Sequence, residues 1–325
     1  MKFPRRRFLH MAAGAAALPA VSRIAQAQTY PTRPVRVIVG FAPGGAPDIV
    51  ARLLGPTLSE RLGQSVYVEN RTGAGSNIAT EAVVNAEPDG YTLLLVSPPN
   101  FVNAALYEKL NYNFIRDIAP VVALIRVPNV MEVNPSVPAK SVPEFVAYAK
   151  VNPDKLNMAS GGIGTSVHMA GELFKMMTGV RMPHVPYRGV GAAYPDLLAG
   201  QVQVMFDSTP GSIEFIRSGR LRALGLAAVT RSPVLPDLPT IAEFVPGYES
   251  SALHGVGAPR NTPPEIIERL NTEFNAALSE PMIKARLIDM GATLLGGTPA
   301  EFGKLFVDET EKWGRVVKFA GIKAS

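Results

Sequence analysis

The sequence predicts an α/β protein, because short apolar segments alternate with amphipathic ones along most of its length. The β-branched segment 35–39 leads into a glycine-rich turn, and an amphipathic helix is then expected up to about Leu62. The same order recurs at 158–160, where a short strand is followed by a second glycine-rich turn and by a helix that ends near Gly179. Strands that pass directly into helices are typical of parallel sheets whose faces are covered by helices.

Other segments support the same architecture. Two further apolar segments, 66–69 and 91–96, are expected to be strands. Capping-box spacings at 141–144 and 262–265 mark the starts of two helices. Additional helices are expected near 78–85 and over 299–319, the latter as one helix or two.

The composition is that of a globular protein with a substantial core and without cysteine. The 325 residues are enough for two domains or one large domain, and a hydrophobic content of 47% is ordinary. The absence of cysteine excludes disulfide bonds, thiolate metal sites and cysteine nucleophiles. After the N-terminal segment, no apolar stretch is long enough to span a bilayer.

The first 27 residues have the three-part layout of a secretory signal. Arginines precede an Ala-rich apolar stretch over 11–21, and Ala25-Gln26-Ala27 offers an A-x-A cleavage site. The order Arg5-Arg6-Arg7-Phe8-Leu9 fits a twin-arginine signal, with an ordinary Sec signal that carries an extra arginine as the alternative. We therefore expect the protein to be exported, with cleavage after about Ala27.

Removal of this segment leaves a chain that is close to electrically neutral. The whole sequence has 32 Lys and Arg residues against 27 Asp and Glu residues, and segment 1–27 contains five basic residues and no acidic one. The mature chain is therefore expected to carry 27 basic and 27 acidic residues. This balance gives no support for binding to nucleic acid or to an anionic membrane surface.

The two glycine-rich turns have the features of anion-binding sites. At the start of a helix the first backbone N–H groups have no partner within the helix, and the helix dipole favours a negative charge. Glycine also allows a ligand to approach the backbone closely. Gly44-Gly45-Ala46 and Gly164-Thr165-Ser166 are therefore two candidate anion cradles, the second with hydroxyl donors. For either turn alone, a tight turn without a ligand is the simpler interpretation, and Asp48 could serve only the helix dipole.

No enzyme signature is present in the sequence. It lacks the G-x-S-x-G elbow of α/β-hydrolases and the glycine-rich fingerprints of phosphate loops and dinucleotide sites. The histidines after the N-terminal segment, His168, His184 and His254, do not have the spacing of metal ligands. We expect His168 to be structural, and Asp207, which follows an apolar strand, to be a binding or loop-fixing acid. No catalytic residue, cofactor or metal is therefore predicted.

Short motifs along the expected mature chain occur in the order found in one receptor family. The most specific are the segments 30–35, 41–48, 68–75, 88–94, 184–189, 196–202 and 235–240. In these motifs the chain resembles the solute-binding receptors of tripartite tricarboxylate transporters, the Bug family. One departure is Leu253-His254-Gly255, where the family often has Trp-x-Gly. The smaller residue either enlarges the pocket or repacks the lobe.

The resemblance implies a type II periplasmic binding protein fold, in which two crossing strands join two α/β lobes and the ligand lies in the cleft. The first lobe would comprise residues 28–127 and 249–325, and the second residues 128–248. Ligands of the family are small carboxylates, namely di- and tricarboxylates, acidic amino acids and aromatic acids. The resemblance therefore implies a periplasmic monomer without a cofactor that delivers such a ligand to a membrane permease of the tripartite tricarboxylate type.

Carried over position by position, the resemblance implies a ligand site shared by the two lobes. On the first lobe the site comprises Pro43, Gly44, Gly45 and Ala46, with Ser76 at the edge. On the second lobe it comprises Ser160, Thr165 and Ser166, with Asp207 orienting waters or a ligand amine. Phe41 and Phe101 are candidate pocket walls, although each could equally belong to the core.

Two alternatives to a transport receptor stay open. Many members of the family have no paired permease, which also allows a periplasmic sensor that presents its ligand to a signalling protein. An exported α/β enzyme is the third alternative, although no motif supports it. The sequence does not identify the carboxylate.

Overall fold

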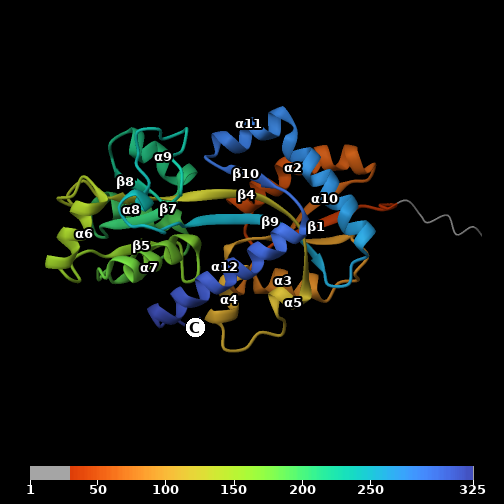
Figure 1. The fold of residues 1–325 in the computed structure, drawn as a ribbon, viewed down its shortest axis with the longest axis horizontal. Helices are drawn as coiled ribbons and strands as arrows, with labels where there is room; N and C mark the ends of the chain where they lie inside the picture. Colours follow the sequence, from red (N-terminus) through yellow and green to blue (C-terminus); the bar gives the residue numbers. More distant parts are fainter. Residues whose placement is uncertain (1–29, 325) are drawn as a thin grey trace, which may run out of the picture.

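The protein folds into two α/β lobes that lie side by side (Figure 1). The computed structural model describes residues 30–324, so the expected signal segment 1–27 lies outside the described residues. Within the described range, no helix combines the length and the apolar character needed to cross a membrane.

The first lobe is built on three parallel strands. β1 (Val35–Val39) lies between β2 (Val66–Asn70) and β3 (Thr92–Val96) and is parallel to both. Antiparallel pairing adds β9 (Ser251–Pro259), β4 (Ile118–Val133) and β10 (Thr293–Gly296). The helices are α2 (Ala46–Leu62), η1 (Ala74–Ser76), α3 (Asn77–Val84), α4 (Pro98–Leu106), α5 (Phe114–Asp117), α10 (Pro264–Ser279) and α11 (Pro281–Asp289).

The second lobe has a smaller sheet with shorter strands. β5 (Met158–Ser160) lies between β6 (His184–Pro186) and β7 (Val204–Ser208) and is parallel to both. β7 and β8 (Arg222–Leu226) are antiparallel to β4. The helices are α6 (Val142–Val151), α7 (Ser166–Thr178), α8 (Val190–Ala199), α9 (Thr209–Arg217) and η2 (Ile241–Glu243).

Strand β4 passes from one lobe into the other. Its residues 118–128 pair with β9, and its residues 129–133 pair with β7. The strand order is therefore β2-β1-β3-β9-β4-β7-β5-β6, with β8 and β10 also paired to β4. Just before β9 begins, Ser250 N donates to the Ala227 carbonyl in the second lobe. The two crossing strands of the expected fold are thus β4 and β9 (Figure 1).

Helix α12 (Pro299–Ala320) packs against both lobes. It contacts α4 and β4, and it also contacts α7 of the second lobe (Figure 1). Its buried residues Phe306 and Trp313 belong to one apolar core that includes Phe101 from the first lobe and Phe174 and Phe206 from the second. The segment predicted as one helix or two is therefore a single helix that completes a core shared by the lobes.

Capping-box spacings predicted the starts of both helices, but only one of the two expected side-chain caps forms. Ser141 Oγ accepts the N–H of Glu144 at 3.4 Å, which caps α6 as expected. The capping box expected from Thr262 is wrong. The Thr262 hydroxyl donates to the Pro259 carbonyl at 2.7 Å in the preceding turn, and Pro263 takes the cap position of α10.

A cluster of polar side chains is buried between the sheet of the second lobe and the helices α8 and α9. Glu132 is fully buried, and neither of its carboxylate oxygens has a hydrogen-bond partner among the described residues. Burial, followed by the nearby Asp207, raises the pKa of Glu132 well above its ordinary value, and the hydroxyls of Ser212 and Tyr194 oppose this rise only in part. The fold therefore favours the neutral form of Glu132.

Replacement of Glu132 by glutamine should stabilise the protein more at alkaline than at acid pH. Because the pKa of Glu132 is raised by folding, its contribution to stability is complete below the unfolded value and is lost as the pH rises towards the folded value. Glutamine does not titrate at this position. Between the unfolded and folded pKa values of Glu132, the free energy of unfolding of the variant should therefore rise relative to that of the wild type by about 1.4 kcal/mol per pH unit.

Thermal denaturation of both proteins from about pH 5 to about pH 8 measures this difference. The exposed Glu268→Gln is the matched control for removal of a glutamate charge. A stability difference between Glu132→Gln and the wild type that does not change with pH would contradict the assignment of Glu132 as a neutral buried acid.

Candidate functional site

A cavity of about 230 Å³ lies between the two lobes. The loop after β1 and the start of α4 bound it on the first lobe, and the starts of α7 and α8 and the end of β7 bound it on the second. The lining residues are Phe41, Ala46, Pro47, Pro98, Pro99, Val127, Thr165, Ser166, Val167, Val190, Asp207, Ser208, Ala252 and His254. The two loops predicted as anion cradles thus face the same cavity from opposite lobes.

Larger hollows occur on the second lobe, but they lie away from both loops. One of about 470 Å³ is lined by residues between Pro135 and Leu238, and another of about 570 Å³ by residues between Val142 and Pro246. Neither is lined by a residue of the first lobe or of the two loops. We therefore take the interlobe cavity as the candidate site, although it is smaller.

The first loop, 41–46, is held from behind by Asp48. Asp48 Oδ2 accepts the N–H of Gly44 at 2.9 Å, and Asp48 Oδ1 accepts from Asn70 Nδ2 at 2.8 Å. Arg52 Nε lies 3.0 Å from both carboxylate oxygens. Burial raises the pKa of Asp48, but these hydrogen bonds, that from Arg52 foremost, outweigh burial and lower the pKa below its ordinary value. The ionised carboxylate of Asp48 therefore binds its own loop.

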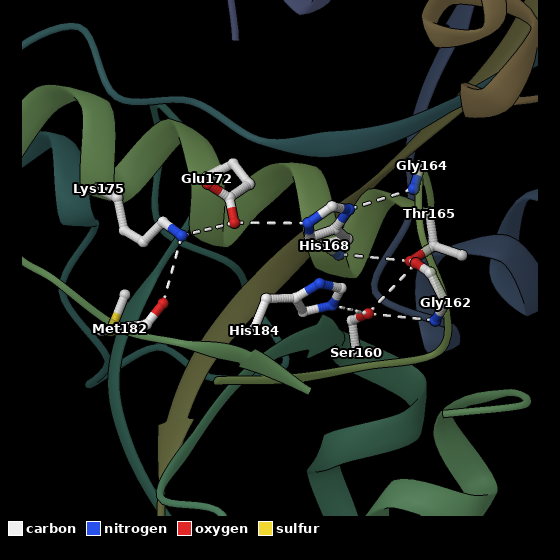
Figure 2. Close-up of polar contacts among 9 residues, drawn as sticks. All are labelled: Ser160, Gly162, Gly164, Thr165, His168, Glu172, Lys175, Met182 and His184. Carbon is white, nitrogen blue, oxygen red and sulfur yellow. Dashed lines mark hydrogen bonds and ion pairs between the residues drawn. The ribbon is translucent and has the colours of Figure 1, made fainter. Parts of the chain in front are cut away.

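The second loop, which leads from β5 into α7, is held by a denser set of contacts (Figure 2). Gly162 N donates to Ser160 Oγ at 3.1 Å, and Gly164 N donates to His168 Nδ1 at 3.2 Å. Thr165 donates its hydroxyl to the Gly162 carbonyl at 2.7 Å. As the N-cap of α7, Thr165 also accepts the N–H of His168 at 3.3 Å. The side chains of this loop are thus engaged with the loop itself.

Two histidine rings stack beneath the second loop (Figure 2). The ring centroids of His168 and His184 are 3.7 Å apart, with 14° between the ring planes. Burial lowers the pKa of His184 to about 3, so this ring is neutral, and its Nε2 lies 2.6 Å from Ser160 Oγ. Burial raises the pKa of Glu172, but contacts with His168 and Lys175 lower it overall. An ionised Glu172 therefore lies one turn further along α7 than His168, 2.6 Å from Lys175 Nζ.

The starts of α2 and α7 supply polar groups to the cavity. Ser166 and Val167 are the first two residues of α7, and their N–H groups have no acceptor within the helix. Ala46 is the first residue of α2, whose N-terminus has no side-chain cap. All three residues line the cavity, whereas no lysine or arginine is among its described lining residues. Backbone N–H groups and helix dipoles, and not a side-chain cation, would therefore meet an anion here.

One acidic side chain, Asp207, lines the cavity at the end of β7. Its Oδ2 accepts the Tyr194 hydroxyl at 2.6 Å. Burial raises the pKa of Asp207, although hydrogen bonds from Tyr194 and Ser208 oppose this effect.

The structure brings five of the residues that the sequence singled out to the cavity wall. These are Phe41, Ala46, Thr165, Ser166 and Asp207. Pro43, Gly44, Gly45 and Ser160 belong to the two loops or to the strand end beside them, but they do not line the cavity themselves. The hydroxyls of Thr165 and Ser160 are engaged within the second loop, so among the three hydroxyl residues expected on this lobe Ser166 is the one left to face a ligand.

Phe101 and Ser76 do not line the cavity. Phe101 is fully buried and packs against Phe114 and Phe306, with ring centroids 5.6 and 5.9 Å apart. Ser76 is buried directly against Gly40, so closely that a Cβ on Gly40 would clash with the serine side chain. Phe101 is thus a core residue, and Ser76 packs at the start of α3.

Sequence reasoning missed most of the apolar wall of the cavity. The missed residues include Pro98 and Pro99 at the start of α4, and Val127, Ala252 and His254 on the crossing strands. The pairing of β9 with β3 and β4 brings them together, and no short motif marks them. Among residues 30–324, no group of three or more His, Asp or Glu side chains is arranged to hold a metal ion.

The sequence offered one signal for these missed residues, the atypical segment around Leu253. Leu253 is fully buried in the apolar core and does not line the cavity, so the departure from tryptophan repacks the lobe. The adjacent His254 does line the cavity. Burial lowers the pKa of His254 to about 4, so it forms a neutral part of the wall.

Comparison with known proteins identifies the same family from sequence. The model of the tripartite tricarboxylate transporter family receptor matches residues 50–322. BugT from Bordetella pertussis strain Tohama I is 39% identical over 300 residues, which cover 91% of this chain and 92% of BugT.

Solved structures show the corresponding fold. Rpa4515 of R. palustris, solved with adipate, is 38% identical with a TM-score of 0.81, and the match covers 90% of this chain and 99% of that one. MatC from Rhodopseudomonas palustris, solved with bound malate, is 35% identical with a TM-score of 0.77, covering 89% of this chain and 100% of MatC. The predicted fold and family are therefore confirmed, and this chain belongs to the receptor family of the tripartite tricarboxylate transporters.

Proposed function

We propose that this chain is a periplasmic receptor that captures a small carboxylate in the interlobe cavity and delivers it to a permease of the tripartite tricarboxylate type. The observation that carries the proposal is the pairing of two helix starts, α2 and α7, across one cavity without a lysine or arginine among its described lining residues. Backbone N–H groups at helix starts are well suited to a carboxylate.

The walls of the cavity restrict the body of the ligand. Apart from the helix starts, the lining consists mainly of apolar side chains, among them Phe41, Pro98, Val127 and Val190. Such walls favour a ligand whose carbon skeleton carries few polar groups, such as a saturated dicarboxylate or an aromatic acid. Adipate and malate, the acids in the structures of the two relatives, are dicarboxylates and are suitable first probes.

Export through segment 1–27 would place the receptor in the periplasm, where a permease could recognise its liganded form. Ligand contact with both lobes favours their closed arrangement, because only that arrangement brings both helix starts to the ligand. The permease would then recognise the surface of the closed, liganded form.

Binding of a diacid should stabilise residues 28–325 measurably. At a concentration of about 100 times Kd, a ligand raises the free energy of unfolding by about 2.7 kcal/mol. We expect adipate or malate to raise Tm, and dimethyl adipate, which has no charge, to leave it unchanged. Calorimetry at neutral pH gives the Kd values. Equal binding of the diacid and the diester would contradict recognition by helix N-termini.

Two substitutions at Ser166 separate its N–H group from its hydroxyl. Proline is well tolerated as the first residue of a helix, and Thr165 before it already has the extended backbone that proline requires. Ser166→Pro removes both the N–H and the hydroxyl and should weaken diacid binding by about 10- to 100-fold, the effect of a hydrogen bond to a charged group. Ser166→Ala removes the hydroxyl alone and should cost about 5-fold.

Equal losses from the two Ser166 variants would show that the hydroxyl, and not the backbone N–H, holds the ligand. Unchanged affinity in both variants would place the ligand outside this cavity. Circular dichroism verifies that each variant keeps its helix content.

Delivery to a permease is tested in cells that lack this chain. Uptake of the radiolabelled acid identified by calorimetry should fall, and expression of the wild-type chain should restore it, while Ser166→Pro should not. Normal uptake together with a lost transcriptional response to the acid would instead support a sensor.

A further inference from the structure

Each of the two cavity loops contains a hydrogen bond from a glycine N–H to a side chain, and the sequence spacing is the same in both. Gly44 N donates to Asp48 Oδ2 at 2.9 Å, and Gly164 N donates to His168 Nδ1 at 3.2 Å. Both glycines have positive φ, +87° and +77°, and both acceptors are the third residue of the helix that follows. Each loop is thus fixed by the side chain that comes four residues after its glycine.

The two acceptors differ in one chemical respect. A carboxylate offers several lone pairs, whereas an imidazole nitrogen accepts a hydrogen bond only when it carries no proton. His168 is fully buried, and its second nitrogen, Nε2, lies 3.4 Å from Glu172 Oε1. Because Nδ1 accepts the Gly164 N–H, the proton of the neutral ring belongs on Nε2, which has Glu172 Oε1 nearby but no well-aligned hydrogen-bond partner among the described residues.

The carboxylate beside Nε2 is itself anchored. Lys175 Nζ donates to Glu172 Oε1 at 2.6 Å and to the Met182 carbonyl at 3.2 Å (Figure 2). Met182 precedes β6, whose residue His184 stacks on His168. The orientation of the His168 ring is therefore determined from two sides, by its own helix and by the neighbouring strand.

The position of Gly164 matters to both lobes. A Cβ placed on Gly164 would lie 2.8 Å from Leu106 Cδ2, on α4 of the first lobe. The glycine also comes two residues before Ser166, whose N–H group faces the cavity in the proposed function. Displacement of Gly164 would change the direction of this N–H group and disturb a contact between the lobes.

We propose that His168 is a positioning residue for the ligand: as the Nε2–H tautomer it holds Gly164 and thereby aims the N–H groups at the start of α7 into the cavity. The part that concerns the ligand rests on the proposed function. The part that concerns the loop stands on the contacts of Gly164, His168 and Glu172 alone.

Two variants of His168 separate the acceptor from the bulk of the ring. Leucine fills the buried space and cannot accept the Gly164 N–H, so His168→Leu should release the loop. In His168→Asn, the side-chain oxygen can accept this N–H in the way that Asp48 does on the first lobe, so the asparagine variant should restore it. Rescue by asparagine distinguishes positioning from simple packing, because leucine is closer to the ring in volume than asparagine is.

The first readout needs no ligand. In protein labelled with ¹⁵N-histidine, the nitrogen shifts of wild-type His168 should show a proton on Nε2 and none on Nδ1. Amide exchange in a peptide that covers 161–168 should be about 10-fold faster in His168→Leu, the effect of one net hydrogen bond, and close to wild type in His168→Asn. A proton on Nδ1, or unchanged exchange in His168→Leu, would overturn the proposal.

The second readout is calorimetry with adipate and malate. His168→Leu should bind about 10-fold more weakly than the wild type, and His168→Asn within about 3-fold of it. Full affinity in His168→Leu would refute a role in ligand positioning. If the wild type bound neither acid, the choice of probe or the proposed function would fail, whereas the histidine tautomer and amide exchange would still decide the role of His168 in the loop. If His168→Leu did not fold, the tautomer of the wild type and the exchange of His168→Asn would decide.

Discussion

The cavity depends on backbone N–H groups that stay unpaired at the starts of α2 and α7. Buried polar groups without partners are costly, so every other group in the two loops must be satisfied. Side chains meet this requirement from behind, through Asp48 on the first lobe and through Ser160 and His168 on the second. Each loop is therefore held by contacts with its own side chains, and the helix starts that border the cavity keep N–H groups without an acceptor in the helix.

The crossing strands bring these two loops to one place. A single strand, β4, pairs with β9 up to Pro128 and with β7 from Asn129 onwards, so one register determines how the two sheets meet. Val127 and Ala252, which lie near this change of partner, form part of the cavity wall. The buried acids of the second lobe also lie on this path, since Glu132 belongs to β4 and Asp207 to β7. Ligand contact and lobe geometry are thus linked through the same strands.

Sequence patterns predicted the features whose residues are adjacent in the chain. The strand 35–39 and the two glycine-rich turns were found from the sequence, because strand, turn and helix start are adjacent in the chain. Phe101 was ambiguous for the opposite reason: an aromatic residue on an amphipathic helix suits a core and a pocket equally well. His168 was correctly expected to be structural, but its partner Gly164 and its contact with Glu172 depend on atomic geometry that spacing alone does not specify. His254 reaches the cavity only through the pairing of β9.

Helix α12 has a consequence for the order in which the protein can mature. It follows all other elements in the chain, yet it covers α4 in the first lobe and α7 in the second. Until the ribosome has released this helix, the faces that Phe306 and Trp313 will cover stay open on both lobes at once. Neither lobe can complete the shared core before α12 has been made, so the partly synthesised chain exposes apolar surface that favours association with other chains.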